Sequence, residues 1–341
     1  MRYAQLGYSG LTVSRFALGA MTFGEYSLGG FRADVDQETA DRMVGLALEA
    51  GVNIIDTAEG YGRGRSEEFV GRALARAKAR DRVVVATKVS AVPESLPAGD
   101  PDLGRLSYRH VVNNAEAALR RLATDWIDLY QLHHPDFETP LEETLRALDD
   151  LVRRGLVRYA GWCNHPAWYA AQARGLQQSG GYAPFVSAQI YYSLAGRDAE
   201  HEILPYCRAA GLGTLIWSPL AGGFLSGKYT REDPSGGGGR RAAMSIPPVD
   251  AEHGYDLVDR LRELAAGHGV PPAHVAYAWL LGSPGVTSVI VGASRMEQLE
   301  SNLAAAGFTL SEAEMASLNA IHPPQPIYPG WLTAWRQPSG R

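Results

Sequence analysis

The stretch 52-VNIIDTAEGYGRGRSEE-68 combines a short apolar run, a polar turn and the start of a helix. The β-branched run 52–57 predicts a buried strand, and Ser66 followed by acidic residues predicts the first turn of a helix over 66–79. Asp56 and Tyr61 lie between the two, and polar groups taken out of water need partners. The stretch therefore predicts a strand followed by a helix, with unusual polar side chains where the strand ends.

The same strand–helix unit recurs along the chain. Short apolar runs predict strands over 16–20, 52–57, 83–89, 127–133, 157–163, 187–192, 213–219 and 288–293. Segments with helical periodicity alternate with them, over 37–50, 66–79, 107–123, 140–154, 166–178, 200–210, 272–281 and 296–306. Eight such units favour an α/β fold of the closed (β/α)8 TIM barrel type over an open doubly wound sheet. One barrel domain would then account for residues 1–341.

Three segments depart from this pattern. Residues 1–15 predict an N-terminal hairpin that plugs the bottom of the barrel. The segments 91–105 and 229–248 are long loops rich in proline or glycine, and such loops inside a compact domain are usually functional or disordered. Because each follows a strand, we expect both at the C-terminal face, where active sites of this fold are built.

The composition excludes several classes of partner. With 45% hydrophobic residues, 20% charged residues and a net charge of -5, the chain is typical of a globular protein. The acidic balance argues against a nucleic-acid partner, because phosphate contacts need concentrated Lys and Arg. The apolar runs are too short to span a membrane, and no secretory signal precedes them. We therefore expect a cytoplasmic protein without a disulfide framework, since it has two cysteines.

Polar and aromatic side chains gather where the predicted strands end, and in a barrel these ends face one mouth. The residues concerned are Asp56, Tyr61, Lys88, His133, Asn164, Gln189, Trp217, Ser218 and Gly292. Taken singly, each has an ordinary explanation as a cap, a solvated strand end or a core residue. Together, a carboxylate, a phenol, an ammonium and an imidazole form a set that can move protons.

Acid–base chemistry suggests a role for each of these four groups. A phenol with a pKa of about 10 is a weak acid near neutral pH unless a cation favours its ionised form. Lys88 can supply that cation, and Asp56 can keep the lysine charged. His133 can orient a substrate oxygen. Reduction of a carbonyl by hydride needs such a set, because a proton must reach the oxygen as negative charge grows on it.

The chain resembles the aldo-keto reductase superfamily over nearly its whole length. The matching stretches are 18-LGAMTFG-24, 56-DTAEGYGRGRSEE-68, 85-VATKV-89, 127-IDLYQLHHPD-136, 161-GWCN-164, 189-QIYYS-193, 217-WSPLAGGFLSGKY-229 and 290-IVGASRMEQLESN-302. The resemblance implies a catalytic tetrad of Asp56, Tyr61, Lys88 and His133, with Tyr61 as the acid. It also implies reversible, NADPH-dependent reduction of an aldehyde or ketone to an alcohol.

The resemblance further implies a nicotinamide cofactor, NADPH or NADP, that lies across the mouth without a Rossmann domain. Asn164 and Gln189 would hold the carboxamide, Trp217 would stack on the nicotinamide, the loop 218–228 would wrap the pyrophosphate, and 292–302 would hold the adenosine phosphate. The full set of implied cofactor residues is Ala20, Met21, Asp56, Cys163, Asn164, Gln189, Trp217, Ser218, Pro219, Leu220, Ala221, Gly222, Lys228, Arg240, Gly292, Ser294, Arg295, Gln298 and Asn302.

The segment 292-GASRMEQLESN-302 predicts a preference for NADPH over NADH. A helix opening after the eighth strand offers free N–H groups to a phosphate. Ser294 adds a hydroxyl, and Arg295 adds a cation able to pair with a 2′-phosphate. Arg240 and Arg241 are further candidates to close over it. The alternative is that Arg295 is only a solvated residue at the helix start.

Two residues depart from the family pattern. Cys163 stands where the family usually has serine, and sulfur is the weaker hydrogen-bond partner. His134 stands where the family often has arginine. Because adjacent strand residues face opposite ways, we expect His134 to point away from Tyr61, as a loop residue.

Other functions compete with the reductase. A Schiff-base aldolase would need Lys88 partly uncharged, which the neighbouring Asp56 disfavours. A metal-dependent hydrolase is disfavoured because His133 and His134 cannot both face one metal from a strand, so we assign no metal. Some relatives are cofactor-binding accessory subunits of membrane channels, and they tend to lack the histidine that His133 represents here.

The sequence leaves the substrate open among aldehydes, small ketones and keto-sugars. Selectivity would lie in the two long loops and in the tail 321–341, where Tyr328, Trp331 and Trp335 would line an apolar pocket or pack against the barrel. A homo-oligomer is left open as well.

Overall fold

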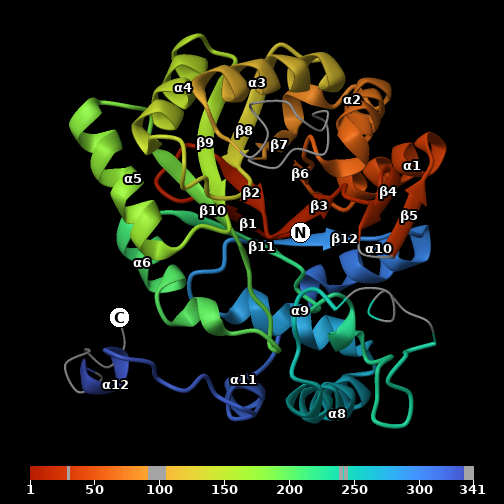
Figure 1. Cartoon of the computed structure of the whole chain (residues 1–341). Coiled ribbons are helices and arrows are strands. Elements are labelled where there is room, and N and C mark those ends of the chain that lie inside the picture. Colours follow the sequence, from red (N-terminus) through yellow and green to blue (C-terminus); the bar gives the residue numbers. More distant parts are fainter. Residues whose placement is uncertain (29–30, 91–104, 238–240, 242–244, 334–341) are drawn as a thin grey trace.

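A closed barrel of eight parallel strands forms the centre of the molecule in the computed structural model, which describes residues 1–28, 31–90, 105–237, 241 and 245–333 (Figure 1). The strands adjoin in the order β10-β11-β12-β3-β6-β7-β8-β9. Their bounds are β3 (Phe16–Gly19), β6 (Ile54–Asp56), β7 (Val84–Val89), β8 (Ile127–Leu132), β9 (Val157–Cys163), β10 (Phe185–Tyr191), β11 (Gly213–Trp217) and β12 (Ser288–Gly292). The predicted (β/α)8 barrel is confirmed.

Helices surround the strands, and each of the eight predicted helices is present. Their bounds are α1 (Gln37–Glu49), α2 (Arg65–Arg76), α3 (Tyr108–Leu122), α4 (Leu141–Arg153), α5 (Ala167–Gly180), α6 (Ile203–Ala210), α9 (Pro272–Gly282) and α10 (Met296–Ala304). The sequence missed α8 (Ala251–His268), α11 (Glu312–Asn319), α12 (Gly330–Thr333) and the hairpin of β4 (Gly24–Leu28) and β5 (Phe31–Val35). Two of these insertions, α8 and the hairpin, follow barrel strands and therefore enlarge the C-terminal side.

The N-terminal hairpin of β1 (Tyr3–Gln5) and β2 (Thr12–Ser14) closes the bottom of the barrel, as predicted. Leu6 and Val13 are fully buried and pack with apolar residues inside the barrel, such as Leu129. Gly7 has a φ of +58°, and a Cβ there would lie 2.5 Å from the carbonyl oxygen of Val186. This close approach seals the N-terminal end and leaves the opposite end as the accessible mouth.

The segments expected to set selectivity are only partly described. Most of the loop 91–105 lies outside the described residues, and so does Trp335 in the tail. Tyr328 and Trp331 are 70% and 58% exposed, and α12 lies at the edge of the molecule (Figure 1). These two rings are therefore not packed against the barrel, while their part in a substrate pocket stays a prediction. None of the helices in the described ranges is long and apolar enough to cross a membrane.

Candidate active site

Four side chains of the predicted tetrad come from three neighbouring strand ends. Asp56 is the last residue of β6, Lys88 lies in β7, and His133 follows β8 directly. Tyr61 begins the short 3-10 turn η1 (Tyr61–Gly64) that follows β6. Because β6 pairs with β7 and β7 with β8 in parallel, these ends open at one edge of the barrel.

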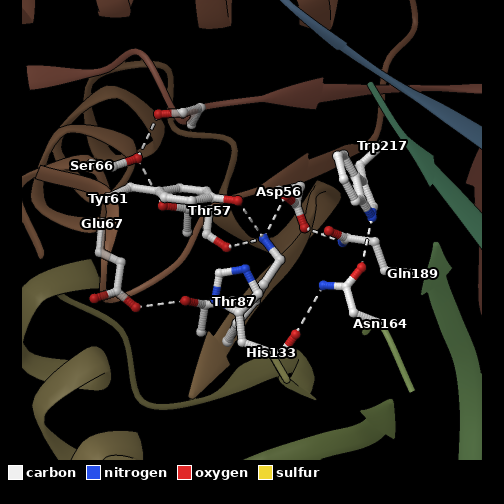
Figure 2. A network of polar contacts seen from close by, with 12 residues as sticks. Asp56, Thr57, Tyr61, Ser66, Glu67, Thr87, His133, Asn164, Gln189 and Trp217 are labelled. Carbon is white, nitrogen blue, oxygen red and sulfur yellow. Dashed lines mark hydrogen bonds and ion pairs between the residues drawn. The ribbon is translucent and has the colours of Figure 1, made fainter. Parts of the chain in front are cut away.

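Lys88 is the centre of the site and is fully buried. Its Nζ donates to Asp56 Oδ2 at 2.7 Å, to the carbonyl oxygen of Thr57 at 2.7 Å and to Tyr61 Oη at 3.3 Å (Figure 2). These acceptors match the three donors of an ammonium. Burial lowers the pKa of Lys88, but Asp56 and Tyr61 raise it by more, so that its pKa lies above the usual value. The lysine is therefore held in its charged form.

The Tyr61 phenol lies against two other members of the site. Lys88 Nζ is 4.8 Å from the centre of its ring, and the His133 ring meets it edge-on at 6.0 Å between centres. Burial raises the pKa of Tyr61, Lys88 lowers it and Asp56 raises it, with a net result above the usual value. The expected effect of the lysine is present, but burial outweighs it. The phenol thus stays protonated at neutral pH and is available as a proton donor.

His133 is a neutral imidazole. Burial, the Lys88 cation and His134 together hold its pKa well below the usual value. The rings of His133 and His134 stack at 4.5 Å with a 13° angle between their planes, so the strand alternation on which the expectation for His134 rested does not hold. That His134 points away from Tyr61 stays a prediction. Because β8 ends at Leu132, strand alternation does not extend to these two residues. His134 does lie in a loop, as expected.

The residues assigned to the nicotinamide end join this site through side-chain hydrogen bonds. Gln189 Nε2 donates to Asp56 Oδ1 at 2.6 Å, and Trp217 Nε1 donates to Asn164 Oδ1 at 2.9 Å (Figure 2). Asn164 Nδ2 donates to the carbonyl oxygen of His133 at 3.1 Å, and Asn164 has a left-handed φ of +57°. Asparagine tolerates this conformation better than most residues. The backbone N–H of Asn164 donates to the carbonyl oxygen of Gln189 at 3.1 Å and joins these bonds. With Lys88 bound to Asp56, the ends of six strands, β6 to β11, are linked into one polar network.

Cys163 lies at the end of β9, beside Gln189 in the sheet. The thiol is buried, and burial raises its pKa, so it is a neutral group. Ala20 follows β3 and donates its N–H to the carbonyl oxygen of Asp56 at 2.8 Å, with Met21 next to it. These three residues border the same mouth as the tetrad.

The loop after β11 forms a second wall of the mouth. Ser218, Ala221 and Gly222 have φ values of +51°, +50° and +69°, and Ser218 Oγ accepts the N–H of Gly222 at 2.9 Å. Arg241 Nη1 donates to the carbonyl oxygens of Ala221 at 3.2 Å and Pro247 at 2.7 Å. Arg241 therefore braces the turn. The other predicted residues here are Pro219 and Leu220 in the turn and the exposed Lys228, whereas Arg240 lies outside the described residues.

The end of β12 lies next to this wall, since β12 pairs with β11. Ser294 donates through both N and Oγ to Gln298 Oε1 at 3.1 Å, and Asn302 Nδ2 donates to the carbonyl oxygen of Gly292 at 3.3 Å. Arg295 is the N-cap of α10 and therefore lies just before the first turn of the helix, which begins at Met296. Arg295 is exposed, and its guanidinium has no hydrogen bond or ion pair within the described ranges.

Comparison with known proteins agrees with this geometry. Residues 16–323 match the model of the Aldo/keto reductase family. The chain belongs to the aldo/keto reductase family. It is 36% identical to an uncharacterized oxidoreductase, YrpG, of Bacillus subtilis, over 95% of this chain and 96% of that protein. It is 33% identical to versiconal hemiacetal acetate reductase of Aspergillus parasiticus, over 97% and 99%, and 32% identical to norsolorinic acid reductase of Aspergillus flavus, over 92% and 79%.

Membership makes this aldo/keto reductase an oxidoreductase of carbonyl chemistry, and the family generally uses nicotinamide cofactors. Within the part of the chain that the structure describes, no group of three or more His, Cys, Asp or Glu side chains could hold a metal ion. Two buried carboxylates next to the tetrad, Glu59 and Glu67, were not predicted as part of the site. The only signal was their place in the motif 56–68, where Glu67 was taken simply as part of a helix start.

Proposed function

We propose that this aldo/keto reductase reduces an aldehyde or ketone to an alcohol with NADPH, reversibly, and that Tyr61 donates the proton. The observation that carries this proposal is the buried chain from Asp56 through Lys88 Nζ to Tyr61 Oη, with distances of 2.7 and 3.3 Å. Such a chain places a protonated phenol beside a permanent cation. A proton donor supported in this way suits an oxygen on which negative charge is growing.

Each side chain then has a defined task. Tyr61 gives its proton to the substrate oxygen, and Lys88 stabilises the tyrosinate that remains. Asp56 and the carbonyl oxygen of Thr57 hold the lysine in place and charged. His133, as a neutral imidazole beside the Tyr61 ring, orients the same oxygen. In the reverse direction, the tyrosinate takes the proton back from the alcohol.

The residues around the mouth fit a nicotinamide dinucleotide, which when bound supplies or accepts the hydride. Gln189 Oε1 has no hydrogen bond in the described parts of the chain, so it is free to accept from a carboxamide. Asn164 would hold the same group, with Cys163 contributing little, and Trp217 would stack on the ring. The turn 218–222 and Lys228 would border the pyrophosphate, while Gly292, Ser294, Gln298 and Asn302 would border the adenosine.

A preference for NADPH over NADH is supported by Arg295. This residue is an exposed arginine without a partner in the described ranges, at the start of α10. An N-cap position would be unfavourable for a cation unless an anion joined it, because the helix dipole is positive there. A 2′-phosphate provides that anion, and a guanidinium can bind it with two hydrogen bonds.

The competing functions are less well supported. An aldolase needs a neutral lysine, whereas Asp56 and Tyr61 raise the pKa of Lys88. An accessory subunit without turnover would have no need of a complete tetrad, and His133 lies against Tyr61. The class of carbonyl substrate, a cytoplasmic location and any homo-oligomer stay predictions.

A panel of aldehydes, ketones and keto-sugars, assayed by loss of NADPH absorbance, tests the proposal. We expect at least one compound to be reduced by the unmodified protein and not by Tyr61→Phe. Borohydride trapping of a substrate on Lys88 would instead support the aldolase. If the whole panel fails while NADPH binds, the reductase proposal is wrong.

A further inference from the structure

Two buried carboxylates next to the tetrad have no part in the proton chemistry described above. Glu59 and Glu67 belong to the motif 56–68 that also carries Asp56 and Tyr61, and they are 1% and 0% exposed. Taking a carboxylate out of water is costly unless hydrogen bonds or cations replace the water. The hydrogen-bond partners of Glu59 and Glu67 therefore show which part of the structure these two carboxylates hold in place.

Glu67 connects α2 to the strand that carries the lysine. Its Oε1 accepts from Thr87 Oγ at 2.6 Å, and its Oε2 pairs with Arg121 Nε at 2.5 Å (Figure 2 shows the bond to Thr87). Thr87 is the residue immediately before Lys88. Because side chains alternate along a strand, Thr87 is held on the outer face of β7 while Lys88 points into the mouth.

Glu59 holds the same strand on the other side of the lysine. Its Oε1 accepts the backbone N–H of Ser90 at 2.6 Å, and its Oε2 accepts from Asn114 Nδ2. Ser90 follows Lys88 by two residues. The end of β7 is thus bound at residues 87 and 90 by two carboxylates from the segment that carries Tyr61.

One face of α3 supports both carboxylates. Asn114 and Arg121 are seven residues apart, which places them on the same side of a helix. Asn114 Oδ1 in turn accepts from Tyr130 Oη at 2.7 Å. Gly64 has a φ of +87°, and a Cβ there would lie 2.6 Å from Arg121 Cδ, so this glycine gives the arginine room to reach Glu67.

We propose that Glu59 and Glu67 are positioning residues that fix Lys88 against Tyr61, by clamping the end of β7 to the turn that carries the phenol. The inference rests on the proposed function, because it assigns these residues to the same proton transfer. The hydrogen bonds given above for the two carboxylates go to the supporting residues Ser90, Asn114, Thr87 and Arg121 and not to the tetrad. Each acts through the backbone or outer face of β7, and the distance that they control is the 3.3 Å between Lys88 Nζ and Tyr61 Oη.

Replacement of the Glu67 carboxylate tests the clamp. A displacement of about 1 Å in a reacting group can reduce a rate by about a hundredfold. For Glu67→Gln we expect kcat to fall by on the order of ten- to a hundredfold, with an unchanged Kd for NADPH. The matched control is Glu68→Gln, since Glu68 is 46% exposed and, among the described residues, pairs only with Arg72 on the surface. This control should keep its kcat.

Thr87 provides a test that does not remove a charge. Thr87→Val deletes the hydroxyl at nearly constant volume, and Thr87→Ser keeps it. We expect Thr87→Val to lose kcat in the same direction as Glu67→Gln and Thr87→Ser to retain it. This pair keeps the proposal falsifiable if Glu67→Gln fails to fold. Equal kcat in both Thr87 variants would overturn it.

The pH profile of alcohol oxidation separates positioning from simple stability. Oxidation needs the tyrosinate, which Lys88 stabilises, so the rise of kcat/KM with pH follows the ionisation of Tyr61. A lysine held farther away would move this rise to higher pH in Glu67→Gln. Removal of a nearby negative charge alone would move it to lower pH, and loss of folded protein would not move it. Either of these last two results contradicts the proposal.

Hydrogen exchange gives a readout that does not need turnover. We expect faster exchange of the backbone amides over 84–90 in Glu59→Gln and Glu67→Gln than in the unmodified protein or Glu68→Gln. If the unmodified protein reduces no carbonyl, the proposed function is wrong, and the exchange data still decide whether the clamp exists. Unchanged exchange over 84–90 in both variants would overturn the clamp itself.

Discussion

The two sides of the barrel mouth satisfy their polar groups in different ways. On the side of β6 and β7, the Lys88 ammonium has three acceptors, and Asp56 binds both Lys88 and Gln189. On the side of β12, Arg295 is exposed and has no polar partner in the described ranges. The first side is organised before a ligand arrives, whereas the second keeps a charge available for one. Polar groups that are already in place favour catalysis, because they need not reorganise during the reaction. An exposed guanidinium without a partner favours recognition of an anion such as a phosphate.

The largest effect expected on the organised side is that of Tyr61→Phe. This change deletes the proposed proton donor and leaves the β11 and β12 walls intact. We expect kcat for carbonyl reduction to fall by roughly a hundred- to ten-thousandfold, with cofactor affinity nearly unchanged. Steady-state kinetics and a cofactor titration by fluorescence measure the two quantities. If Tyr61→Phe keeps most of its kcat in a reaction limited by the chemical step, Tyr61 is not the proton donor.

The organised side should also be the more sensitive to acid. Burial lowers the pKa of His165, which follows Asn164, to about 4, against about 6.5 in an unfolded chain. The unfolded state therefore binds more protons between these values, and the free energy of unfolding falls as the pH drops from 6.5 to 4. At 1.36 kcal/mol per pKa unit, His165 alone accounts for about 3 kcal/mol.

Denaturant unfolding at several pH values measures this dependence. His165→Gln should flatten the curve between pH 6.5 and 4, because its side chain does not titrate. His133 contributes in the same direction, since its pKa is also lowered. A His165→Gln protein with the same slope as the unmodified one would show that this imidazole does not govern acid unfolding.

On the open side, Arg295→Ala should weaken binding of NADPH and barely change that of NADH. Loss of a charge-assisted hydrogen bond is worth roughly 1.5–3 kcal/mol, which is about a ten- to hundredfold rise in Kd. Arg42→Ala, at an exposed position of α1, is a control with the same change of charge. Equal losses for both cofactors, or equal affinities in the unmodified protein, would show that Arg295 does not recognise the 2′-phosphate.

Much of the fold was predictable because the strand–helix period is local. A short β-branched run such as 127–132 and the helix that follows it are defined by neighbouring residues. The missed elements break the rule of one helix per strand: within the described ranges, both α8 and α9 follow β11, and the β4–β5 hairpin stands between β3 and α1. The regular alternation of strands and helices in the sequence does not predict such additional elements. Both follow strand ends, where a barrel tolerates variation.

The site divides in a similar way. Asp56, Lys88 and His133 could be found because each lies where a strand ends, so the sequence alone places them together. The partners of Glu59 and Glu67 could not, since Asn114 and Arg121 lie on a helix more than 50 residues away along the chain. The stacking of His133 on His134 was missed for a different reason. It depends on where β8 ends to within one residue, which periodicity does not determine.

Trp217 lies between the two sides and should give the smallest effect. Its Nε1 donates to Asn164 of the organised network, while its ring lies 5.2 Å from that of Tyr191 and is only partly buried. If the ring stacks on the nicotinamide, Trp217→Ala should weaken cofactor binding by about 0.5–1.5 kcal/mol, that is, by roughly two- to tenfold. Trp217→Phe keeps an aromatic face but loses the N–H donor, so it should retain most of the affinity if stacking dominates. Melting with and without NADPH separates binding from core packing. If Trp217→Ala lowers the melting temperature but NADPH stabilises it as much as the unmodified protein, Trp217 is a core residue of the organised side. The boundary between the two sides would then lie at the turn that begins with Ser218.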